Sequence, residues 1–334
     1  MSTPGRGDAV RAALARLRSA SRYGGVARDA ISKLPAALRL VREHGRPAAV
    51  VYFGGAPGDD LLLTPVLRAM DAERAGPLWV MSAHASLFAG NPHVAATLPF
   101  DDGLARALSA LGVRRLRLRY HDYLPSQDRS LAPDDHIVRL MALRAGVRGP
   151  VDVAPEVFLT EAEIEAGRIA PRQVAIQSTA LGAGMAIRNK EWFPERFQQV
   201  VDRLSGGVQF VQLGLASDPP LAGAVDLRGR TTLREAGAVL ANSTAFVGLV
   251  GFLMHMARAV RTPSVIVYGG REHPSQSGYA ENPNLCSPVP CSPCWLWSRC
   301  DFGRMCLDRI TADDVVAALN EVLEARDDSG RSDR

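Results

Sequence analysis

The chain has 334 residues, which is comfortable for two domains, and its 47% apolar and 22% charged residues are typical of a globular protein. No stretch approaches the ~18 to 20 consecutive apolar residues of a membrane span, which excludes a protein built around transmembrane helices. The net charge is only +4, but residues 1–48 carry ten Lys or Arg against three acids, so this leader alone is +7.

The basic leader suits a membrane surface or another anionic partner, although such charge runs are more often a solvated pair of amphipathic helices. Its apolar residues are interrupted by Arg11, Arg16, Arg18 and Arg22, so a cleaved secretory signal is not expected. We therefore expect a cytoplasmic protein. If it contacts the inner face of a membrane, the basic leader is the part expected to do so. No fold signature of a nucleic-acid-binding protein is present.

After the leader, strands and helices alternate. Residues 48–53 predict a short buried strand that ends in the turn-rich run 54–58, and residues 59–70 have helical spacing with an acid at the N-cap. Further strands are expected around 78–81 and 116–120, and a helix over 134–144. Strands that alternate with helices predict a parallel sheet with helical crossovers.

The pattern restarts near residue 171. Strands are expected over 173–177, 208–213, 244–248 and 264–268, and helices over 194–204, 232–242, 254–260 and 311–325. The fold class is therefore α/β, with two Rossmann-like, doubly wound domains facing a cleft, where ligands bind beyond the carboxyl ends of the strands. The expected divisions are a basic helical leader over 1–46, an N-terminal domain over 47–165, a C-terminal domain over 166–325 with a cysteine-rich segment at 286–306, and a disordered tail over 326–334.

Two groups of residues suit chemistry in such a cleft. Asp59 follows the first strand in the run Gly-Asp-Asp-Leu-Leu-Leu-Thr-Pro, where a carboxylate either takes a proton from an acceptor hydroxyl or caps the helix. Ser178 and Thr179 end a strand and precede Lys190, and two hydroxyls with a cation suit a diphosphate. The alternative is that Lys190 is solvated and that Trp192 belongs to the core.

These runs resemble the signatures of glycosyltransferase family 9, the heptosyltransferases of lipopolysaccharide assembly. Residues 58–69 are similar to its Gly-Asp-x-Leu-Leu-x-Thr-Pro-x-x-Arg-Ala motif, 91–94 to its Asn-Pro turn, and 226–235 to its Leu-x-Gly-x-Thr-Ser-Leu-x-Glu segment. The resemblance spans residues of about 48 to 320 and implies a GT-B fold. It also implies that Asp59 is the general base, that Asp60 remains a helix cap, and that Lys190 lies on the donor phosphates.

The resemblance extends to a donor-binding loop, with departures. The family has a Val-Gly-x-Asp-Ser/Thr-Gly-x-x-His run here, and this chain keeps Gly248 and His255 but has Val250, Gly251 and Phe252 at the Asp, hydroxyl and Gly positions. Helix-end amides can still meet phosphate, whereas valine cannot make a carboxylate contact to the sugar. His255 suits a structural core histidine equally well. The expected donor-binding residues are Ser178, Thr179, Lys190, Gly214, Gly248, Gly251 and His255.

All five cysteines fall between Cys286 and Cys306, which in a cytosolic chain indicates a metal site or a local knot rather than disulfides. Four thiolates can surround one tetrahedral zinc or iron ion, and we expect Cys291, Cys294, Cys300 and Cys306 to do so. The alternative is a set of reduced buried thiols. Family members carry a similar cysteine finger, which is associated with iron in the autotransporter heptosyltransferases. A closed four-thiolate site would be structural rather than catalytic.

The leading hypothesis is an inverting glycosyltransferase that moves a sugar, heptose from ADP-heptose by the resemblance, to a hydroxyl of a glycan, protein or small molecule. The transfer itself requires no cofactor if Lys190, the strand-end hydroxyls and helix-end amides stabilise the leaving diphosphate. A non-catalytic protein that kept the fold and binds sugar nucleotides, or acts as a scaffold, is the alternative, favoured by Val250 and Phe252. A nicotinamide-dependent dehydrogenase is disfavoured because no Gly-x-Gly-x-x-Gly follows the first strand.

Overall fold

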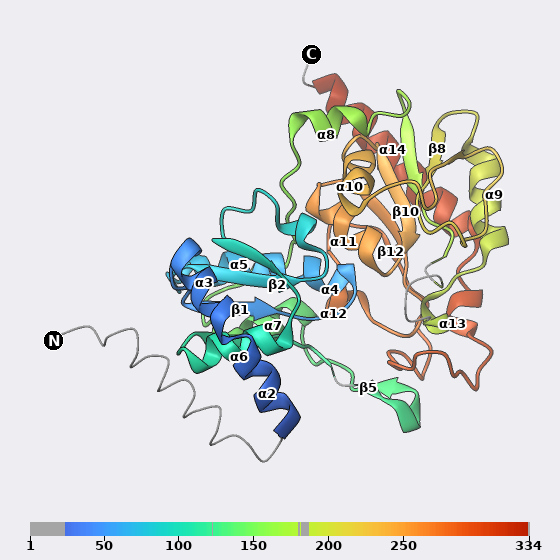
Figure 1. The fold of residues 1–334 in the computed structure, drawn as a ribbon. Coiled ribbons are helices and arrows are strands. Elements are labelled where there is room, and N and C mark those ends of the chain that lie inside the picture. Colours follow the sequence, from blue (N-terminus) through green and yellow to red (C-terminus); the bar gives the residue numbers. More distant parts are fainter. Residues whose placement is uncertain (1–23, 122, 180, 182–186, 333–334) are drawn as a thin grey trace, which may run out of the picture.

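The computed structural model describes residues 24–121, 123–179, 181 and 187–332, and it contains two parallel sheets that stand side by side (Figure 1). The N-terminal sheet has the order β3-β2-β1-β4. Its strands are β1 (Ala49–Tyr52), β2 (Leu78–Ser82), β3 (Ala96–Pro99) and β4 (Arg114–Arg117). β1 lies at the centre and is buried at every position, because helices cover both faces of a parallel sheet.

Helices cover this sheet on both faces. They are α2 (Gly24–Ser32), α3 (Leu34–His44), α4 (Pro57–Leu61), α5 (Leu63–Ala72), η1 (Ala85–Phe88), α6 (Asp102–Ala110) and α7 (Ile137–Ala145). One face packs on α2, α3 and α6, where Ala30, Leu34 and Ala37 are buried with Tyr52 and Trp79. The described part of the leader is therefore built into the core of this lobe. Residues 1–23, the rest of the leader, lie outside the described residues.

The helix expected over 59–70 is broken into α4 and α5 at Leu62. Pro65 has no backbone N–H to donate to the carbonyl of Leu61, four residues before it. The Thr64 hydroxyl donates to that carbonyl instead, at 2.8 Å. The break lets α4 turn towards the second lobe while α5 packs along the sheet (Figure 1).

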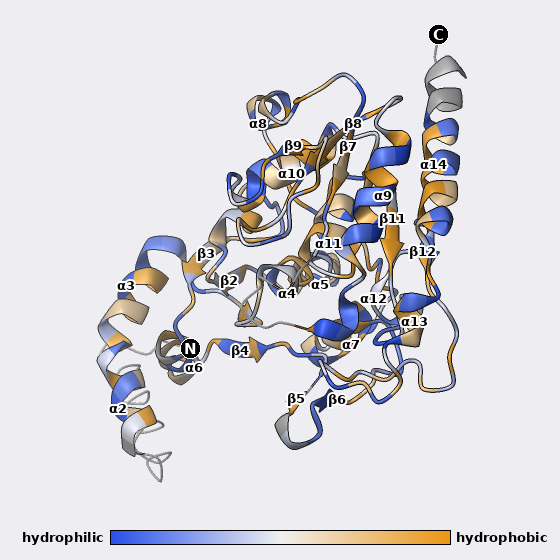
Figure 2. Ribbon diagram, turned by 90° about the vertical axis from the view of Figure 1, so that its right-hand side faces the viewer, coloured by the Kyte–Doolittle hydropathy of each residue, from blue (hydrophilic) through white to orange (hydrophobic). Residues whose placement is uncertain are grey.

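The C-terminal sheet has the order β12-β11-β10-β7-β8-β9. Its strands are β7 (Gln173–Ile176), β8 (Gln209–Gln212), β9 (Val225–Asp226), β10 (Ala245–Leu249), β11 (Ser264–Val267) and β12 (Asn284–Leu285). Its helical elements are α8 (Glu161–Ala166), η3 (Arg188–Lys190), α9 (Pro194–Leu204), α10 (Leu233–Ala241), α11 (Phe252–Ala259), α12 (Pro274–Ser277), α13 (Met305–Asp308) and α14 (Ala312–Ser332). In Figure 2, β11 is orange along its length, whereas α9 and α14 alternate blue and orange because one side of each faces solvent.

The tail expected to be disordered from residue 326 is helical to Ser332, as the last turns of α14. Starting a helix is costly, but each residue added to an existing helix gains one backbone hydrogen bond for the entropy it loses. A polar extension of a docked helix can therefore stay helical. Within the described residues, no helix combines the length and the apolar character needed to cross a lipid bilayer.

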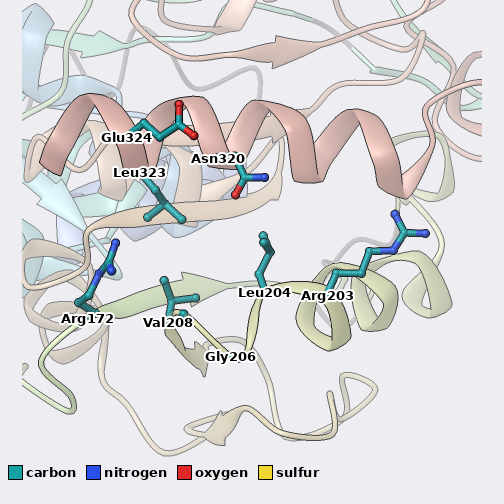
Figure 3. Close-up of a pocket in the computed structure, with 9 residues that line it drawn as sticks. Arg172, Arg203, Leu204, Gly206, Val208, Asn320, Leu323 and Glu324 are labelled. Carbon is teal, nitrogen blue, oxygen red and sulfur yellow. The ribbon is translucent and has the colours of Figure 1, made fainter. Parts of the chain in front are cut away.

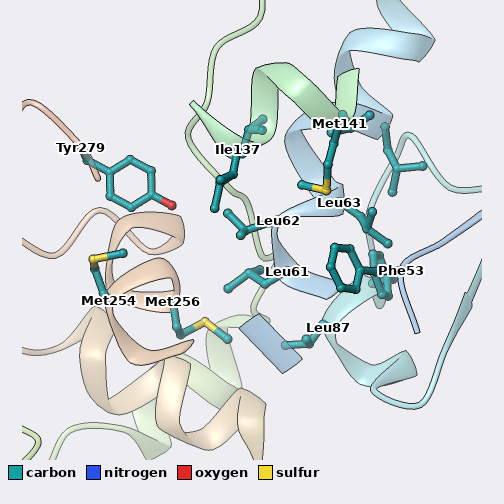
Figure 4. Packing of buried hydrophobic residues seen from close by; sticks show 14 of the residues in the cluster. Phe53, Leu61, Leu62, Leu63, Leu87, Ile137, Met141, Met254, Met256 and Tyr279 are labelled. Carbon is teal, nitrogen blue, oxygen red and sulfur yellow. The ribbon is translucent and has the colours of Figure 1, made fainter. Parts of the chain in front are cut away.

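The two lobes meet through a continuous apolar interface. Leu61 of α4, Leu62 directly after it and Ile137 of α7 belong to the same buried cluster as Met254 and Met256 of α11 (Figure 4). Since α4 follows the carboxyl end of β1 and α11 follows that of β10, this contact sets the carboxyl ends of the two sheets against each other. That junction is where a doubly wound fold binds ligands.

Candidate active site

Asp59 lies at the junction of the two lobes, on α4. It is half-buried, and its Oδ1 accepts a hydrogen bond from the Tyr120 hydroxyl at 2.7 Å, while its Oδ2 accepts the Ala56 N–H at 3.2 Å. Burial raises the pKa of Asp59, against the lowering by these two hydrogen bonds and by Lys190. A carboxylate with a raised pKa is a stronger base, which suits proton abstraction from a hydroxyl.

The role expected for Asp60 is wrong. It is Asp59 whose carboxylate accepts the free N–H at the start of α4, whereas the Asp60 side chain turns to the end of β2. There its Oδ2 accepts the Ser82 hydroxyl at 2.6 Å and lies 2.8 Å from His84 Nδ1. Consecutive residues of a helix point about 100° apart, so only one of the two acids can reach back to the first turn.

Lys190, on η3 of the C-terminal lobe, is close enough for its charge to act on Asp59. Its Nζ lies 2.5 Å from Glu272 Oε1, and its charge also acts on Asp59, whose pKa it lowers. Burial lowers the pKa of Lys190, and Glu272 opposes that shift. Burial would raise the pKa of Glu272, but Lys190 and Arg271 lower it to about 2. The alternative of a solvated Lys190 does not hold, because the lysine is part of a buried cluster of alternating charges.

Trp192, which follows Lys190, belongs to the core of the C-terminal lobe and is 2% exposed. The alternative that placed Trp192 in the core is therefore confirmed. Its indole Nε1 donates to the Ile310 carbonyl at 2.9 Å.

The strand-end hydroxyls are engaged within the C-terminal lobe. Ser178 Oγ donates to the Pro219 carbonyl and accepts from Gln212 Nε2, both at 3.0 Å. Thr179 Oγ1 donates to the Glu191 carboxylate. A hydroxyl has one proton, so each would have to change partner before it could donate to a phosphate.

The glycines expected at the donor have different surroundings. Gly214 has a φ of +140° and leaves no room for a Cβ, which would lie 2.3 Å from Asp218 Oδ2. A Cβ on Gly248 would lie 2.3 Å from the Phe246 ring, so this glycine serves packing within β10. Gly251 precedes the first residue of α11 and has no atom within 4 Å of its Cβ position. It is the most open of the three, although the next residue, Phe252, packs against α4, where a Cβ on Gly58 would lie 3.5 Å from the Phe252 Cα.

The departures in the donor loop lie at the lobe junction. Val250 is 2% exposed and packs in the interlobe cluster. His255 is buried, with Nδ1 2.7 Å from the Tyr279 hydroxyl, and burial followed by the charge of Lys190 lowers its pKa to about 3. His255 is therefore neutral at physiological pH and held in the core.

Several residues that surround Lys190 and Asp59 were not foreseen from the sequence. Tyr120 and His121 follow β4, with ring centroids 4.5 Å apart, and burial together with Arg271 lowers the pKa of His121 to about 4. The guanidinium of Arg271 lies 4.6 Å from the Trp295 ring centroid and 5.6 Å from that of Trp297. Only the position of Tyr120 and His121 at the end of an expected strand could have indicated a place in the site.

The four cysteines expected to bind a metal gather in one region without forming a ligand set. The pKa of Cys294 is raised by burial and also by Cys306 and Cys291, and that of Cys306 by burial and also by Cys300 and Cys291. Among the described residues, no group of three or more His, Cys, Asp or Glu is arranged to hold a metal ion. The thiols are free, and a metal does not fit them as they are placed.

A hollow of about 360 Å³ opens on the far side of the C-terminal lobe, between the α9–β8 turn and α14 (Figure 3). It is lined by Arg172, Arg203, Leu204, Gly206, Gly207, Val208, Asn320, Leu323 and Glu324. None of the residues expected in the active site lines it. Because α9 and α14 cover the face of the sheet opposite α11, this hollow is separate from the lobe junction.

Two Rossmann-like lobes that meet at the carboxyl ends of their strands define a GT-B fold, and solved structures share it. The iron-containing dodecameric glycosyltransferase TibC of enterotoxigenic Escherichia coli H10407 superposes with a TM-score of 0.65 at 19% identity, over 84% of this chain and 77% of that one. The ADP-heptose lipopolysaccharide heptosyltransferase II of E. coli superposes with a TM-score of 0.63 at 18% identity, over 84% and 99%.

Sequence comparison finds a similarity to one family in the C-terminal half of the chain. Residues 161–298 match the model of glycosyltransferase family 9 (heptosyltransferase). The chain is also 27% identical over 188 residues to lipopolysaccharide heptosyltransferase 3 of E. coli (strain K12), and it spans about half of that relative, 52% of each chain being matched. The family predicted from the motifs is thus the one whose model residues 161–298 match, and this C-terminal region is similar to glycosyltransferase family 9.

Proposed function

We propose that this protein is an inverting glycosyltransferase that transfers a sugar from a nucleotide-diphosphate donor, with ADP-heptose as the donor, to a hydroxyl of an acceptor. The observation that carries the proposal is the placement of Asp59 and Lys190 on opposite lobes of one junction, each within the electrostatic reach of the other. The match of residues 161–298 to the heptosyltransferase family model and the relatives named for heptose transfer support the donor.

In this mechanism Asp59 takes the proton of the acceptor hydroxyl, whose oxygen attacks the anomeric carbon as the bond to the diphosphate breaks. Tyr120 and the Ala56 N–H hold the carboxylate and leave lone pairs free for that proton. Lys190 and the amides at the start of α11 stabilise the charge on the leaving diphosphate. Ser178 and Thr179 would join them only by exchanging their present partners.

The alternative is a non-catalytic sugar-nucleotide-binding or scaffold protein, which the buried Val250 favours. A valine in the apolar cluster cannot contact a sugar hydroxyl through a carboxylate. Against the alternative stands Asp59, whose raised pKa and hydrogen-bonded carboxylate a scaffold does not need.

The deciding experiment measures ADP release from ADP-heptose, with a lipopolysaccharide core as acceptor, for wild type and Asp59→Asn. We expect kcat to fall by about 10²- to 10⁴-fold, the usual contribution of a general base, with ADP affinity retained. Asp202→Asn, a surface change on α9, is the matched control. ADP release at the same background rate in wild type and Asp59→Asn, with ADP still bound, would establish the scaffold instead.

The cysteines, the acceptor and the location complete the proposal. Zinc or iron at Cys291, Cys294, Cys300 and Cys306 would be structural, and binding would require the thiols to move from their described positions. Support comes from the gathering of the thiols and from TibC being described as iron-containing. Metal analysis of purified protein, before and after Cys294→Ser, tests it.

The acceptor is a glycan, most simply lipopolysaccharide core, reached from the cytoplasmic face of a membrane through the basic leader.

A further inference from the structure

Lys190 is held in place through its neighbour in the chain. The backbone N–H of Asn189 donates to the Trp297 carbonyl at 3.0 Å, and its side-chain Nδ2 donates to the carbonyls of Leu296 and Arg299 at 3.2 and 2.9 Å. Asn189 is 4% exposed, so these bonds are protected from water. The cysteine-rich segment thus anchors η3, the short element that carries the lysine.

The same segment reaches Lys190 from a second side. Trp295 and Trp297 lie against the guanidinium of Arg271, and the Trp295 N–H donates to the Arg271 carbonyl at 3.0 Å. Arg271 is paired with Glu272, whose Oε1 lies 2.5 Å from Lys190 Nζ. A chain of contacts therefore runs from the two tryptophans to the ammonium group.

The segment also binds the N-terminal lobe, at the hairpin formed by β5 (Tyr123–Leu124) and β6 (Arg129–Ser130). The Ser130 N–H donates to the Trp295 carbonyl at 3.0 Å, and Trp297 Nε1 donates to Ser130 Oγ at 2.9 Å. Asp128 Oδ2 accepts the Ser298 N–H at 2.8 Å. Residues 295–299 are thus fixed to both lobes.

We propose that the cysteine-rich segment is a positioning element of the donor site, which holds Lys190 towards Asp59 through Asn189 and through the Arg271–Glu272 pair. The identity of the ligand that Lys190 binds rests on the proposed function, whereas the positioning of Lys190 by this segment does not depend on it. A buried ammonium group keeps its charge only while a carboxylate stays beside it, and a diphosphate is met most strongly by a cation already in place. This role makes Trp295, Trp297 and Asn189 functional without contact with substrate.

The sequence makes the test direct, because Lys33 and Lys190 are the only lysines. Protein labelled with ¹³C-lysine gives two ε-CH₂ signals by NMR, and each titrates with its own amine. Lys33 pairs with Asp101 on the N-terminal lobe at 2.5 Å and serves as an internal reference. The groups that act on Lys190 are Glu272, Arg271 and Asp59, with neutral His255 nearby.

Two variants move the Lys190 titration in opposite directions. Glu272→Gln removes the carboxylate and leaves Arg271, so the midpoint of Lys190 should fall by about one pH unit or more. Asn189→Ala releases η3 towards solvent, so the midpoint should rise towards that of a free lysine. In both variants the Kd for ADP should rise about tenfold, the effect of losing about 1.4 kcal/mol, while the Lys33 signal stays unchanged.

Asp301→Asn is the control, because it breaks only the exposed Arg299–Asp301 pair of the same segment and should change neither readout. A Lys190 midpoint that stays at the wild-type value in Glu272→Gln would overturn the proposal. Should Asn189→Ala not fold, Glu272→Gln, which keeps the size of the side chain, decides alone. If the Lys190 midpoint shifts in Glu272→Gln but the wild-type protein does not bind ADP, the positioning role stands and the proposed glycosyltransferase function is refuted.

Discussion

Replacing Tyr120 with phenylalanine tests whether Asp59 acts as a base in its ionised form. The Tyr120 hydroxyl donates to Asp59 Oδ1 at 2.7 Å, and this bond lowers the pKa of a carboxyl that burial raises. Hydrogen bonds to charged groups contribute about 1.5–3 kcal/mol, and one pKa unit corresponds to about 1.4 kcal/mol. Tyr120→Phe should therefore raise the pKa of Asp59 by about one to two units.

The consequence appears in the pH profile of kcat/KM. A base works only when deprotonated, so activity is lost as the pH falls through its pKa, and raising that pKa moves the acidic limb of the profile to higher pH. We expect a displacement of about one to two pH units in Tyr120→Phe, with most of the activity recovered above the new limb. Tyr123→Phe is the control, because the Tyr123 hydroxyl approaches Asp128 instead. An acidic limb that stays in place would show that Asp59 does not set it, and the general-base assignment would fail.

Two predictions concern stability. Gly167→Ala would place a Cβ 2.2 Å from the backbone carbonyl carbon of Ala238, so it should lower the free energy of unfolding in urea by about 1–3 kcal/mol. Gly206→Ala, with nothing within 4 Å of its Cβ position, should be near neutral, and equal losses would contradict the steric reasoning. Arg234 lowers the pKa of Glu163 to about 2 from its usual 4.5, so the pair stabilises the fold above pH 4.5 and less as the pH falls towards 2. Glu163→Gln should cost about 1 kcal/mol or less at pH 7, because the pair is partly exposed, and that cost should vanish near pH 2, whereas a pH-independent cost would contradict this assignment.

Much of the fold could be predicted because its signals are local. The buried run of β1 and the restart near residue 171 follow from apolar spacing and turn residues. The motifs placed Asp59 after the first strand, and Lys190 in the loop that follows the strand ending at Ser178 and Thr179. The break between α4 and α5 was missed although Pro65 indicates it, because the apolar spacing continues across it. The length of α14 was missed because its last residues are polar, and a polar sequence does not indicate where a docked helix ends.

The rest of the site depends on contacts between distant parts of the chain. Arg271 and Glu272 form an ordinary polar pair in a loop after β11, and only the fold sets them beside Lys190. Trp295 and Trp297 lie among cysteines, whose spacing indicated a metal site rather than a contact with Arg271. Asp59 and Asp60 are indistinguishable by spacing, and their roles separate only when Tyr120 and Ser82 come into place around them.

The change at residue 250 is better understood as a repacked junction than as a lost contact. Val250 is 2% exposed in the cluster that joins α4 to α11, so aspartate there would be buried without a partner unless the lobes separated. Restoring the family's residue would therefore disturb the interface that sets Asp59 opposite Lys190, and it need not restore a sugar contact. Besides Asp59, the carboxylate at this junction is that of Glu272, on the loop after the neighbouring strand, and it is already paired with Lys190. If the donor sugar is recognised at this junction, its hydroxyls must be met by backbone groups and by this charge cluster, which makes the geometry of Lys190 and Glu272 more important here than the side chain at position 250.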